Sequence, residues 1–236
     1  MDSKPMHKPE KRCPIACVLM AAGVGSRYQL PDPADLAPET AGEKGRGAGL
    51  RAKGHDNKLT AVFRGKPMLV WALDCLGEQD FTARVAVVRA DETAKLVPQN
   101  VFRIVWNRGE DTSPSKTNRC ALSAVPEDAV GWLFAVGDQP LLTEESVKRL
   151  CETFAANPER IVRLSWEGKP GNPVIFPRAL FPELLALKDG ESGKTVMRRH
   201  PERVMLVEAG SEWELQDIDT KANLREVREG SAGRHS

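Results

Sequence analysis

A short glycine-containing loop near the start of the chain predicts a site for a phosphate-bearing ligand. The apolar run from Ile15 to Met20 breaks into small residues with Gly23 and Gly25, and Ser26 and Arg27 follow directly. Backbone N–H groups can approach a ligand closely where no Cβ intervenes, and an arginine supplies charge and planar donors. The loop alone does not identify the ligand, because a glycine turn between a strand and a helix also occurs as plain structure.

Two familiar phosphate-binding motifs are excluded by their spacing. A dinucleotide fingerprint requires G-x-G-x-x-G, and Tyr28 stands where the third glycine should be, which disfavours an ordinary Rossmann oxidoreductase. The segment Gly190–Thr195 (GESGKT) is similar to a Walker A box, but Lys188 occupies the place of its first glycine. The residues before it also have a helical pattern instead of that of a strand, so we expect a loop between helices there.

Two acidic segments are candidates for binding a metal. Asp138 follows the apolar run Gly131–Val136, and an isolated carboxylate at a strand end is a natural ligand of Mg²⁺, although a plain turn aspartate is the alternative. Asp217 and Asp219 would point to one face of an extended segment, with Ile218 buried on the other. Taken alone, this second acidic segment could equally be the cap of the last helix.

Lys58 comes directly after a segment of unusual composition. Residues 28–56 contain five glycines and three prolines without a sustained periodicity, so we expect a flexible insertion. A tolerated surface loop is its commoner explanation, and a lid over the glycine loop is the alternative because both ends abut the expected site. A lone lysine usually faces solvent, but Lys58 adjoins the expected strand edge and precedes an apolar segment.

The segments around these residues alternate between strand and helix patterns. We expect strands at Pro14–Met20, Leu59–Phe63, Ala83–Ala90, Phe102–Trp106, Gly131–Val136, Arg160–Ser165, Pro173–Phe176, Arg203–Val207 and Glu214–Ile218. We expect helices from about Pro67 and at Ser115–Ala124, Glu144–Phe154, Arg178–Leu187, Lys194–His200 and Lys221–Val227. This alternation predicts a mostly parallel sheet covered on both faces.

The expected topology places the chemistry at one edge of the sheet. Ligands of open α/β sheets bind at the carboxyl ends of the strands, so Gly23–Arg27 and Gly137–Pro140 should lie at the same edge. Residues 13–229 are expected to form a single domain, with residues 1–12 and 230–236 as flexible tails.

Composition narrows the class of protein. The 34 basic and 33 acidic residues nearly cancel, which argues against a nucleic acid or a membrane as the partner. No apolar run approaches the ~20 residues of a membrane span. The five cysteines are an odd number without C-x-x-C spacing, which is typical of reduced thiols in a cytoplasmic protein.

Taken together, these segments resemble the molybdenum cofactor nucleotidyltransferases, most closely their cytidylyl branch. The matching segments are Leu19–Arg27 (LMAAGVGSR), Asn57–Leu59 (NKL), Gly65–Leu69 (GKPML), Val136–Thr143 (VGDQPLLT), Gly168–Pro177 (GKPGNPVIFP) and Asp217–Thr220 (DIDT). The resemblance implies a Rossmann-like α/β three-layer sandwich with a mostly parallel sheet. It also implies an enzyme that transfers CMP from CTP to the molybdopterin phosphate of the molybdenum cofactor, with Mg²⁺ as cofactor and pyrophosphate as product. The modified cofactor would then serve a molybdenum hydroxylase.

The resemblance further assigns roles to individual residues. Arg27, Lys58 and Asp138 would be catalytic, Asp138 and Asp219 would hold the metal, and Asn172 would face the acceptor. The nucleotide-binding residues would be Ala21, Ala22, Gly23, Gly25, Ser26, Arg27 and Lys58. Ala22 favours cytosine, because the guanylyl branch tends to have glycine there. The chain departs from the family in placing 30 residues between Arg27 and Lys58.

Two other functions stay open at this point. The chain could be a guanylyltransferase that uses GTP, or another small-molecule nucleotidyltransferase. It could also be a non-catalytic module that binds the molybdenum cofactor and delivers it to a molybdenum hydroxylase or its chaperone. The presence of Arg27, Lys58, Asp138 and Asp219 together favours catalysis, because binding alone would not need both metal-binding acids.

Overall fold

The computed structural model describes residues 14–23, 28, 57–109, 113–124, 126 and 128–230. Gly25, Ser26 and Arg27 lie outside the described residues, as do the predicted tail 1–12, residues 231–236 and all of the predicted insertion except Tyr28.

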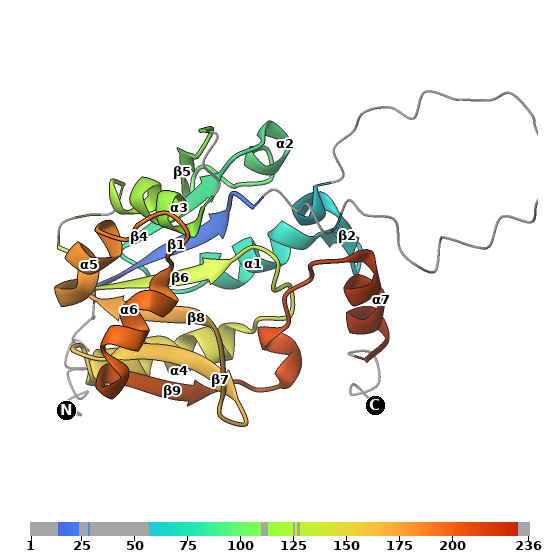
Figure 1. Ribbon diagram of the computed structural model, residues 1–236. Helices are drawn as coiled ribbons and strands as arrows, with labels where there is room; N and C mark the ends of the chain where they lie inside the picture. The colour runs from blue at the N-terminus through green and yellow to red at the C-terminus, as the bar shows by residue number, and fades with distance from the viewer. Residues whose placement is uncertain are drawn as a thin grey trace, which may run out of the picture.

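A seven-stranded sheet in the order β5-β4-β1-β6-β8-β7-β9 forms the centre of the molecule (Figure 1). Only β8 runs antiparallel to its neighbours among these seven described strands, so the prediction of a mostly parallel sheet is confirmed. The strands are β1 (Ile15–Ala21), β4 (Ala83–Val88), β5 (Arg103–Trp106), β6 (Gly131–Val136), β7 (Ile161–Trp166), β8 (Lys169–Pro177) and β9 (Val204–Glu208).

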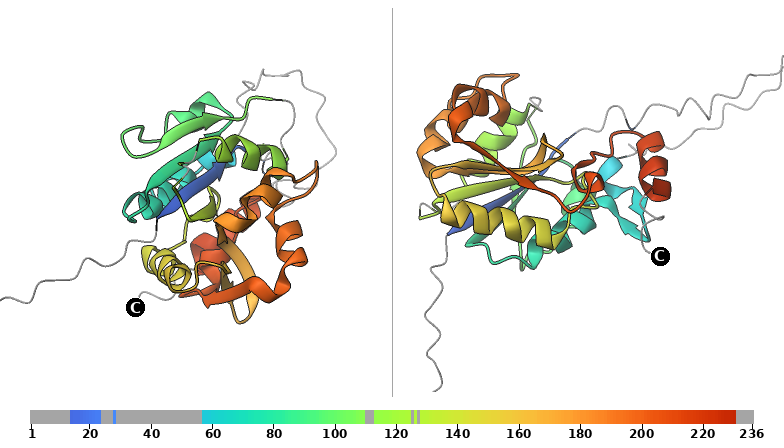
Figure 2. Two further views of the ribbon diagram at one scale, coloured as in Figure 1. Left: turned by 90° about the vertical axis from the view of Figure 1, so that its left-hand side faces the viewer. Right: turned by 90° about the horizontal axis from the view of Figure 1, so that it is seen from below.

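Helices cover both faces of this sheet and make three layers (Figure 2). Alternate residues of β1 point to opposite faces, as a strand requires, so that Cys17 and Leu19 join one apolar cluster while Ala16 and Val18 join another. The first cluster includes side chains of α1 (Met68–Gly77) and α4 (Glu144–Ala156). The second includes those of α3 (Pro114–Leu122), α5 (Phe181–Leu185) and α6 (Gly193–Arg199).

A third, smaller apolar cluster lies beside the sheet. It joins the hairpin of β2 (Val62–Phe63) and β3 (Lys66–Pro67) to the last helix, α7 (Lys221–Gly230), as Figure 1 shows. Ile218 is fully buried in this cluster. Its burial fixes the chain between two acidic residues, Asp217 and Asp219.

Most predicted elements are confirmed, and two strand predictions are wrong. The segment predicted as a strand at Glu214–Ile218 forms a 3₁₀ helix, η5 (Glu212–Leu215), followed by irregular backbone. The segment predicted as extended from Leu59 begins with a 3₁₀ turn, η2 (Lys58–Thr60), before β2. In the segment from Leu59, the side chain of Asn57 binds the backbone locally. In the segment from Glu214, the side chain of Glu214 binds a distant part of the chain.

Short elements complete the chain. The predicted helix over residues 178–187 divides into η3 (Arg178–Leu180) and α5, and the sequence patterns missed α2 (Asp91–Ala94) and η4 (Pro201–Arg203). Among the described helices, none is long and apolar enough to cross a membrane.

Candidate functional site

The carboxyl ends of β1 and β6 lie side by side and open into a cavity of about 180 Å³, here called the first cavity. The two strands are paired in register up to Met20 and Val136, and the N–H of Gly137 donates to the carbonyl of Met20 at 3.1 Å. The expectation that both loops share one edge is therefore correct for the described residues. The cavity is lined by Met20, Ala22, Gly23, Lys58, Leu59, Thr117, Val136, Gly137 and Asp138.

Lys58 reaches this cavity because η2 turns it inward. The side chain of Asn57 caps the turn by accepting from the N–H of Leu59 at 3.1 Å, and it donates to Thr93 Oγ1 at 2.8 Å. Leu59 is buried under the turn, and only 8% of Lys58 is exposed. Capping by Asn57 thus stabilises a 3₁₀ turn where the apolar pattern predicted extended backbone.

The ammonium of Lys58 lies between two carboxylates. Its Nζ donates to Asp138 Oδ2 at 2.5 Å and to Asp219 Oδ1 at 2.8 Å, across 80 and 161 positions of sequence. Burial alone would lower the pKa of Lys58, but the charges of these two carboxylates and the hydrogen bonds to them raise it above its ordinary value. Lys58 therefore carries a positive charge at neutral pH. Three residues that the sequence singled out separately form one ionic cluster.

Hydrogen bonds between the two acidic segments fix this cluster. The N–H of Ile218 donates to the carbonyl of Asp138 at 3.0 Å. The amide of Gln139, which is 2% exposed, donates to the carbonyl of Leu215 at 3.1 Å and to Asp217 Oδ1 at 2.9 Å. Gln139 was not among the predicted site residues, although its position inside the Gly137–Pro140 motif was a signal for it.

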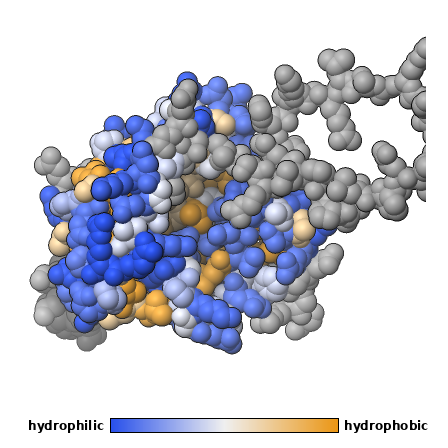
Figure 3. Space-filling view, viewed as in Figure 1, coloured by the Kyte–Doolittle hydropathy of each residue, from blue (hydrophilic) through white to orange (hydrophobic). Residues whose placement is uncertain are grey.

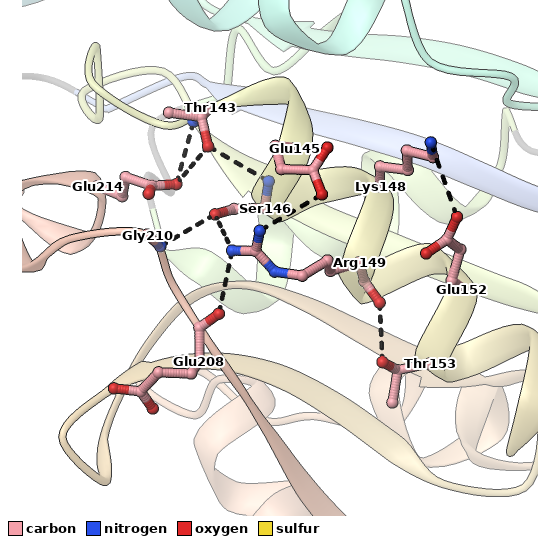
Figure 4. A network of polar contacts seen from close by, with 10 residues as sticks. All are labelled: Thr143, Glu145, Ser146, Lys148, Arg149, Glu152, Thr153, Glu208, Gly210 and Glu214. Carbon is pink, nitrogen blue, oxygen red and sulfur yellow. Dashed lines mark hydrogen bonds and ion pairs between the residues drawn. The ribbon is translucent and has the colours of Figure 1, made fainter.

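A second anchor lies further back, at the start of α4. Glu214 is 2% exposed, and its Oε2 accepts from the N–H of Thr143 at 3.2 Å and from its hydroxyl at 2.8 Å (Figure 4). Thr143 Oγ1 also accepts from the N–H of Ser146 at 3.2 Å and so caps α4. A buried carboxylate is stable only when it is hydrogen-bonded, so Glu214 ties the segment before Asp217 to this helix. Sequence patterns gave no signal for this role, because Glu214 looks like an ordinary surface acid.

Asp217 and Asp219 both turn toward the Asp138 segment, while Ile218 points away into the third apolar cluster. The predicted alternation is therefore present without a strand. Asp217 is exposed by surface area, but desolvation of its carboxyl and the nearby charge of Asp138 raise its pKa to about 6, against the opposing hydrogen bond from Gln139. Excess negative charge is thus concentrated around Lys58.

The residues present fit a divalent metal ion. Because Asp138 and Asp219 already share one ammonium nitrogen, their oxygens converge on a single position suited to a cation. Mg²⁺ typically takes one or two protein carboxylates and completes its shell with water and substrate phosphates. The described side chains include no group of three or more His, Cys, Asp or Glu arranged for a metal, so a bound ion would need oxygens from its substrate.

A second cavity of about 300 Å³ adjoins the first, with Met20 and Val136 lining both. Because β8 is antiparallel to β6, its early residue Asn172 lies at the carboxyl end of β6 and lines this second cavity instead of the first. The other lining residues are Asn118, Phe134, Arg163, Val174, Phe176, Leu184, Ser192, Gly193, Lys194 and Met197.

The segment similar to a Walker A box forms the connection into α6, as expected. Ser192 caps this helix by accepting from the N–H of Lys194 at 3.3 Å. Lys194, which belongs to this segment, lines the second cavity, as does Arg163, which its sequence context did not single out.

A family described as a MobA-like NTP transferase domain matches residues 17–204 of the chain. The match includes Lys58, Asp138 and Asn172, whereas Asp219 lies beyond its end. No curated protein sequence matches the chain.

Several solved structures share the fold. Rv0371c from Mycobacterium tuberculosis H37Rv is 21% identical with a TM-score of 0.69, over 92% of this chain and 98% of that one. A second structure of Rv0371c, at 19% identity, TM-score 0.63 and the same coverage, is a complex with manganese. Mth528, a nucleotidyl transferase from Methanothermobacter thermautotroptrophicus, is 22% identical with a TM-score of 0.69, over 92% and 96% of the two chains.

A more distant neighbour was solved with a nucleotide. CMP:2-keto-3-deoxy-manno-octonic acid synthetase, complexed with CTP, is 14% identical with a TM-score of 0.62, over 93% of this chain and 98% of that one. At such identities the likeness establishes the fold, and the expected α/β nucleotidyltransferase architecture is confirmed.

Proposed function

The chain belongs to the family of MobA-like NTP transferase domains, and on that premise we propose that it transfers CMP from CTP to the molybdopterin phosphate of the molybdenum cofactor. Pyrophosphate is the second product, and the modified cofactor serves a molybdenum hydroxylase. The observation that carries this proposal is the convergence of Asp138 and Asp219 on one cation position beside the first cavity. The cytidylyl character rests on the matching sequence segments and on Ala22, which lines that cavity.

In this reaction an oxygen of the acceptor phosphate attacks the α-phosphorus of CTP, and pyrophosphate leaves in line. The protein contributes mainly by positioning the substrates and stabilising charge. The small residues Ala21, Ala22 and Gly23 leave room for the triphosphate at the end of β1. An added Cβ at Gly23 would meet no described atom within 4 Å, so the backbone there is open to a ligand.

Asp138 and Asp219 would hold Mg²⁺, which when bound neutralises charge on the triphosphate oxygens. Lys58 contacts the same carboxylate oxygens, so its ammonium must move aside as the nucleotide arrives. Its nearest anionic destination is then the triphosphate, where it would hold a phosphate together with Arg27. When the nucleotide binds, the Lys58 ammonium would exchange its carboxylate partners for phosphates. The ammonium and the two carboxylates would then each still have a partner of opposite charge.

Two structural neighbours support these assignments. The complex of Rv0371c with manganese supports a divalent ion, and the synthetase complexed with CTP supports a cytidine nucleotide on this fold.

The experiment measures pyrophosphate release from CTP with purified protein, Mg²⁺ and intact molybdenum cofactor. We expect turnover only when all three are present, and GTP in a parallel titration should be a poorer substrate. Asp138→Ala should lower turnover by about 10²–10³-fold, because it removes a charge-stabilising contact. Asp91→Ala is the matched control, since Asp91 pairs with Arg108 on the surface.

Each alternative has its own outcome. Turnover that prefers GTP would replace the cytidylyl assignment with a guanylyl one. Binding of the cofactor without any turnover would indicate a carrier module. Equal turnover by wild type and Asp138→Ala would contradict the proposed role of the acidic pair.

A further inference from the structure

Residues 209–220, here called the connecting segment, must cross the end of the sheet to bring Asp219 to Asp138, because β8 and β7 lie between β6 and β9. Figure 1 shows the segment running from β9 through η5 to α7. Apart from η5 it forms neither strand nor helix, so its backbone depends on specific contacts for its order. Hydrophilic residues predominate on the surface in the same view, with apolar ones in patches between them (Figure 3). Polar contacts are therefore expected to contribute to that order.

The start of α4 holds the beginning of the connecting segment. The guanidinium of Arg149 donates to the carbonyl of Glu208 at 3.2 Å, and the N–H of Gly210 donates to Ser146 Oγ at 3.3 Å (Figure 4). Ser146 is fully buried, and its hydroxyl also accepts from Arg149 at 2.9 Å. The backbone is thus attached to the helix directly where β9 ends.

Glu214 makes a further contact with α4 and places a buried charge there. Its Oε2 accepts from the N–H and the hydroxyl of Thr143, and its Oε1 lies so close to Gly210 that an added Cβ on that residue would come within 2.6 Å. The carboxylate therefore fills the space between the connecting segment and the helix. Hydrogen bonds to a charged acceptor are stronger than neutral ones, and the amino end of a helix favours a negative charge.

Apolar contacts anchor the connecting segment but do not orient it. Leu215 packs against the first apolar cluster, and Ile218 lies in the third. The free energy of such contacts follows the area buried and has no preferred direction. Hydrogen bonds have strict angular preferences, so the bonds of Glu214 are better suited to fix the direction in which the chain leads to Asp219.

The spacing of these contacts closes a ring around the ionic cluster. Thr143 follows Asp138 by five positions, and Glu214 precedes Asp219 by five. The bonds between Thr143 and Glu214 brace the two acidic segments at one end. Lys58 bridges the same two segments at the other end through both aspartates.

We propose that Glu214 is a positioning residue, which through Thr143 holds Asp219 where it and Asp138 can bind one divalent cation. The inference rests on the proposed function, which assigns the cation to these two carboxylates. Glu214 is not among the described residues that line the first or the second cavity, so it acts on the site through the backbone. Its role is greatest once Lys58 has moved to the nucleotide, because the ammonium then no longer links the two segments.

The first test measures the Kd for CTP by titration calorimetry, once with saturating Mg²⁺ and once with EDTA. Glu214→Met should raise this Kd by about tenfold or more in Mg²⁺ and by less than about threefold in EDTA, because only the metal-dependent part of binding uses Asp219. Glu214→Gln keeps an oxygen acceptor for Thr143 and should restore most of the affinity in Mg²⁺. A general loss of structure would instead weaken binding under both conditions.

The second test needs neither metal nor nucleotide. The N–H of Ile218 donates to the carbonyl of Asp138, so its hydrogen exchange, followed by NMR in EDTA, reports whether the two acidic segments stay together. Glu214→Met should accelerate this exchange by about tenfold or more and leave that of Phe134 in β6 unchanged. Thr143→Val removes only the hydroxyl from the brace. It should change the exchange and the Kd in Mg²⁺ in the same direction by smaller factors, and it tests the inference even if Glu214→Met does not fold.

Glu208→Met is the matched control. Glu208 lies directly before the connecting segment, but its carboxylate points away from α4 in Figure 4 and binds Ser165 Oγ and the N–H of Glu167. Its carbonyl bond to the helix does not involve the side chain. The variant should therefore have the wild-type Kd for CTP and the wild-type exchange of Ile218. Equal effects of the Glu208 and Glu214 variants would overturn the inference.

The two tests together separate this inference from the proposed function. Accelerated exchange of Ile218 in Glu214→Met, combined with a wild-type Kd for CTP in Mg²⁺, would overturn the inference and leave the proposed function standing. CTP binding by wild type that does not respond to Mg²⁺ would contradict the metal assignment of the proposed function. Accelerated exchange would in that case still support the role of Glu214 in positioning Asp219.

Discussion

The two adjoining cavities share Met20 and Val136 but are surrounded by opposite charges. Around Lys58 the described carboxylates of Asp138, Asp217 and Asp219 outnumber the single ammonium. The second cavity has Arg163 and Lys194 and no acidic lining residue. Because excess charge attracts a group of opposite sign, the first side favours a cation and the second an anion.

The two sides also differ in how the chain builds them. The first uses the ends of the parallel strands β1 and β6, where residues after each strand meet at one edge. The second depends on the reversed strand β8, which brings residues before its buried part to that same edge. A single antiparallel strand thus places a second cavity beside the first.

Removing the Lys58 ammonium beside the first cavity should have the largest effect on the unfolding free energy. Lys58→Met leaves two largely buried carboxylates facing each other, so we expect the metal-free protein to lose about 3 kcal/mol of unfolding free energy. Saturating Mg²⁺ should stabilise the variant more than wild type, because no ammonium competes for the oxygens. Urea denaturation with and without Mg²⁺ measures both effects.

Lys66→Met is the control for that experiment. Lys66 also pairs with an aspartate, Asp74, but both side chains are substantially exposed, so the loss should stay below ~1 kcal/mol and be independent of Mg²⁺. Equal responses of the two variants to Mg²⁺ would contradict the assignment of Asp138 and Asp219 to a metal.

Two glycines allow each side to be perturbed separately. Gly23→Ala adds a methyl group where no described atom lies within 4 Å, so the fold should persist while the Kd for CTP rises about fivefold, on the order of 1 kcal/mol. Gly193→Ala would bring its Cβ to 2.9 Å from the ring of Phe176, a wall residue of the second cavity. It should crowd the second cavity and leave CTP binding unchanged. Calorimetric titration of CTP into both variants checks this, and an equal rise in Kd for the two variants would contradict a division into two cavities with separate roles.

The smallest expected effect on the unfolding free energy comes from Asp217, which is part of the excess negative charge around Lys58. The pKa of Asp217 is about 6 in the folded protein and 3.8 as the reference value, so between these pH values the folded state binds more protons than the unfolded chain. The unfolding free energy of the metal-free protein should therefore fall as the pH rises through this window. Asp217→Asn should remove that fall and stabilise the protein at pH 7 by less than ~1 kcal/mol, because the residue is partly screened by solvent.

Thermal or urea unfolding across pH in the presence of EDTA provides the measurement. Asp128→Asn, a change at an exposed aspartate away from both cavities, is the control. A pH profile of Asp217→Asn parallel to that of wild type would show that the carboxylates around Lys58 do not influence one another.

The parts that the sequence predicted well are those dictated by burial. β1 and β6 are continuous apolar runs because helices cover both of their faces, and the rule that ligands meet strand ends then placed Gly23 and Asp138 together. The resemblance extended this to Lys58 and Asp219. The contacts of Lys58 with Asp138 and Asp219 span distances in sequence that local patterns do not encode.

The parts that it missed depend on long-range hydrogen bonds and strand direction. An apolar strand pattern is the same in either direction, so it does not reveal that β8 is reversed or that Arg163 faces a cavity. The pattern of Glu214–Ile218 suggested a strand, but the buried bonds of Glu214 to Thr143 stabilise a 3₁₀ helix there. Roles proposed for Gly25, Ser26 and Arg27 concern residues outside the described ones.

The attachment of Asp219 has a consequence for the order in which the protein matures. Every strand of the sheet is complete by Glu208, whereas Glu214, Ile218 and Asp219 follow it. During synthesis the sheet can therefore assemble while Lys58 still has only Asp138 as a partner. The cluster is completed when the segment after Glu208 emerges and docks through Ile218 and Glu214. Any activity that needs both carboxylates is therefore expected only after the segment that carries Asp219 has docked on the sheet.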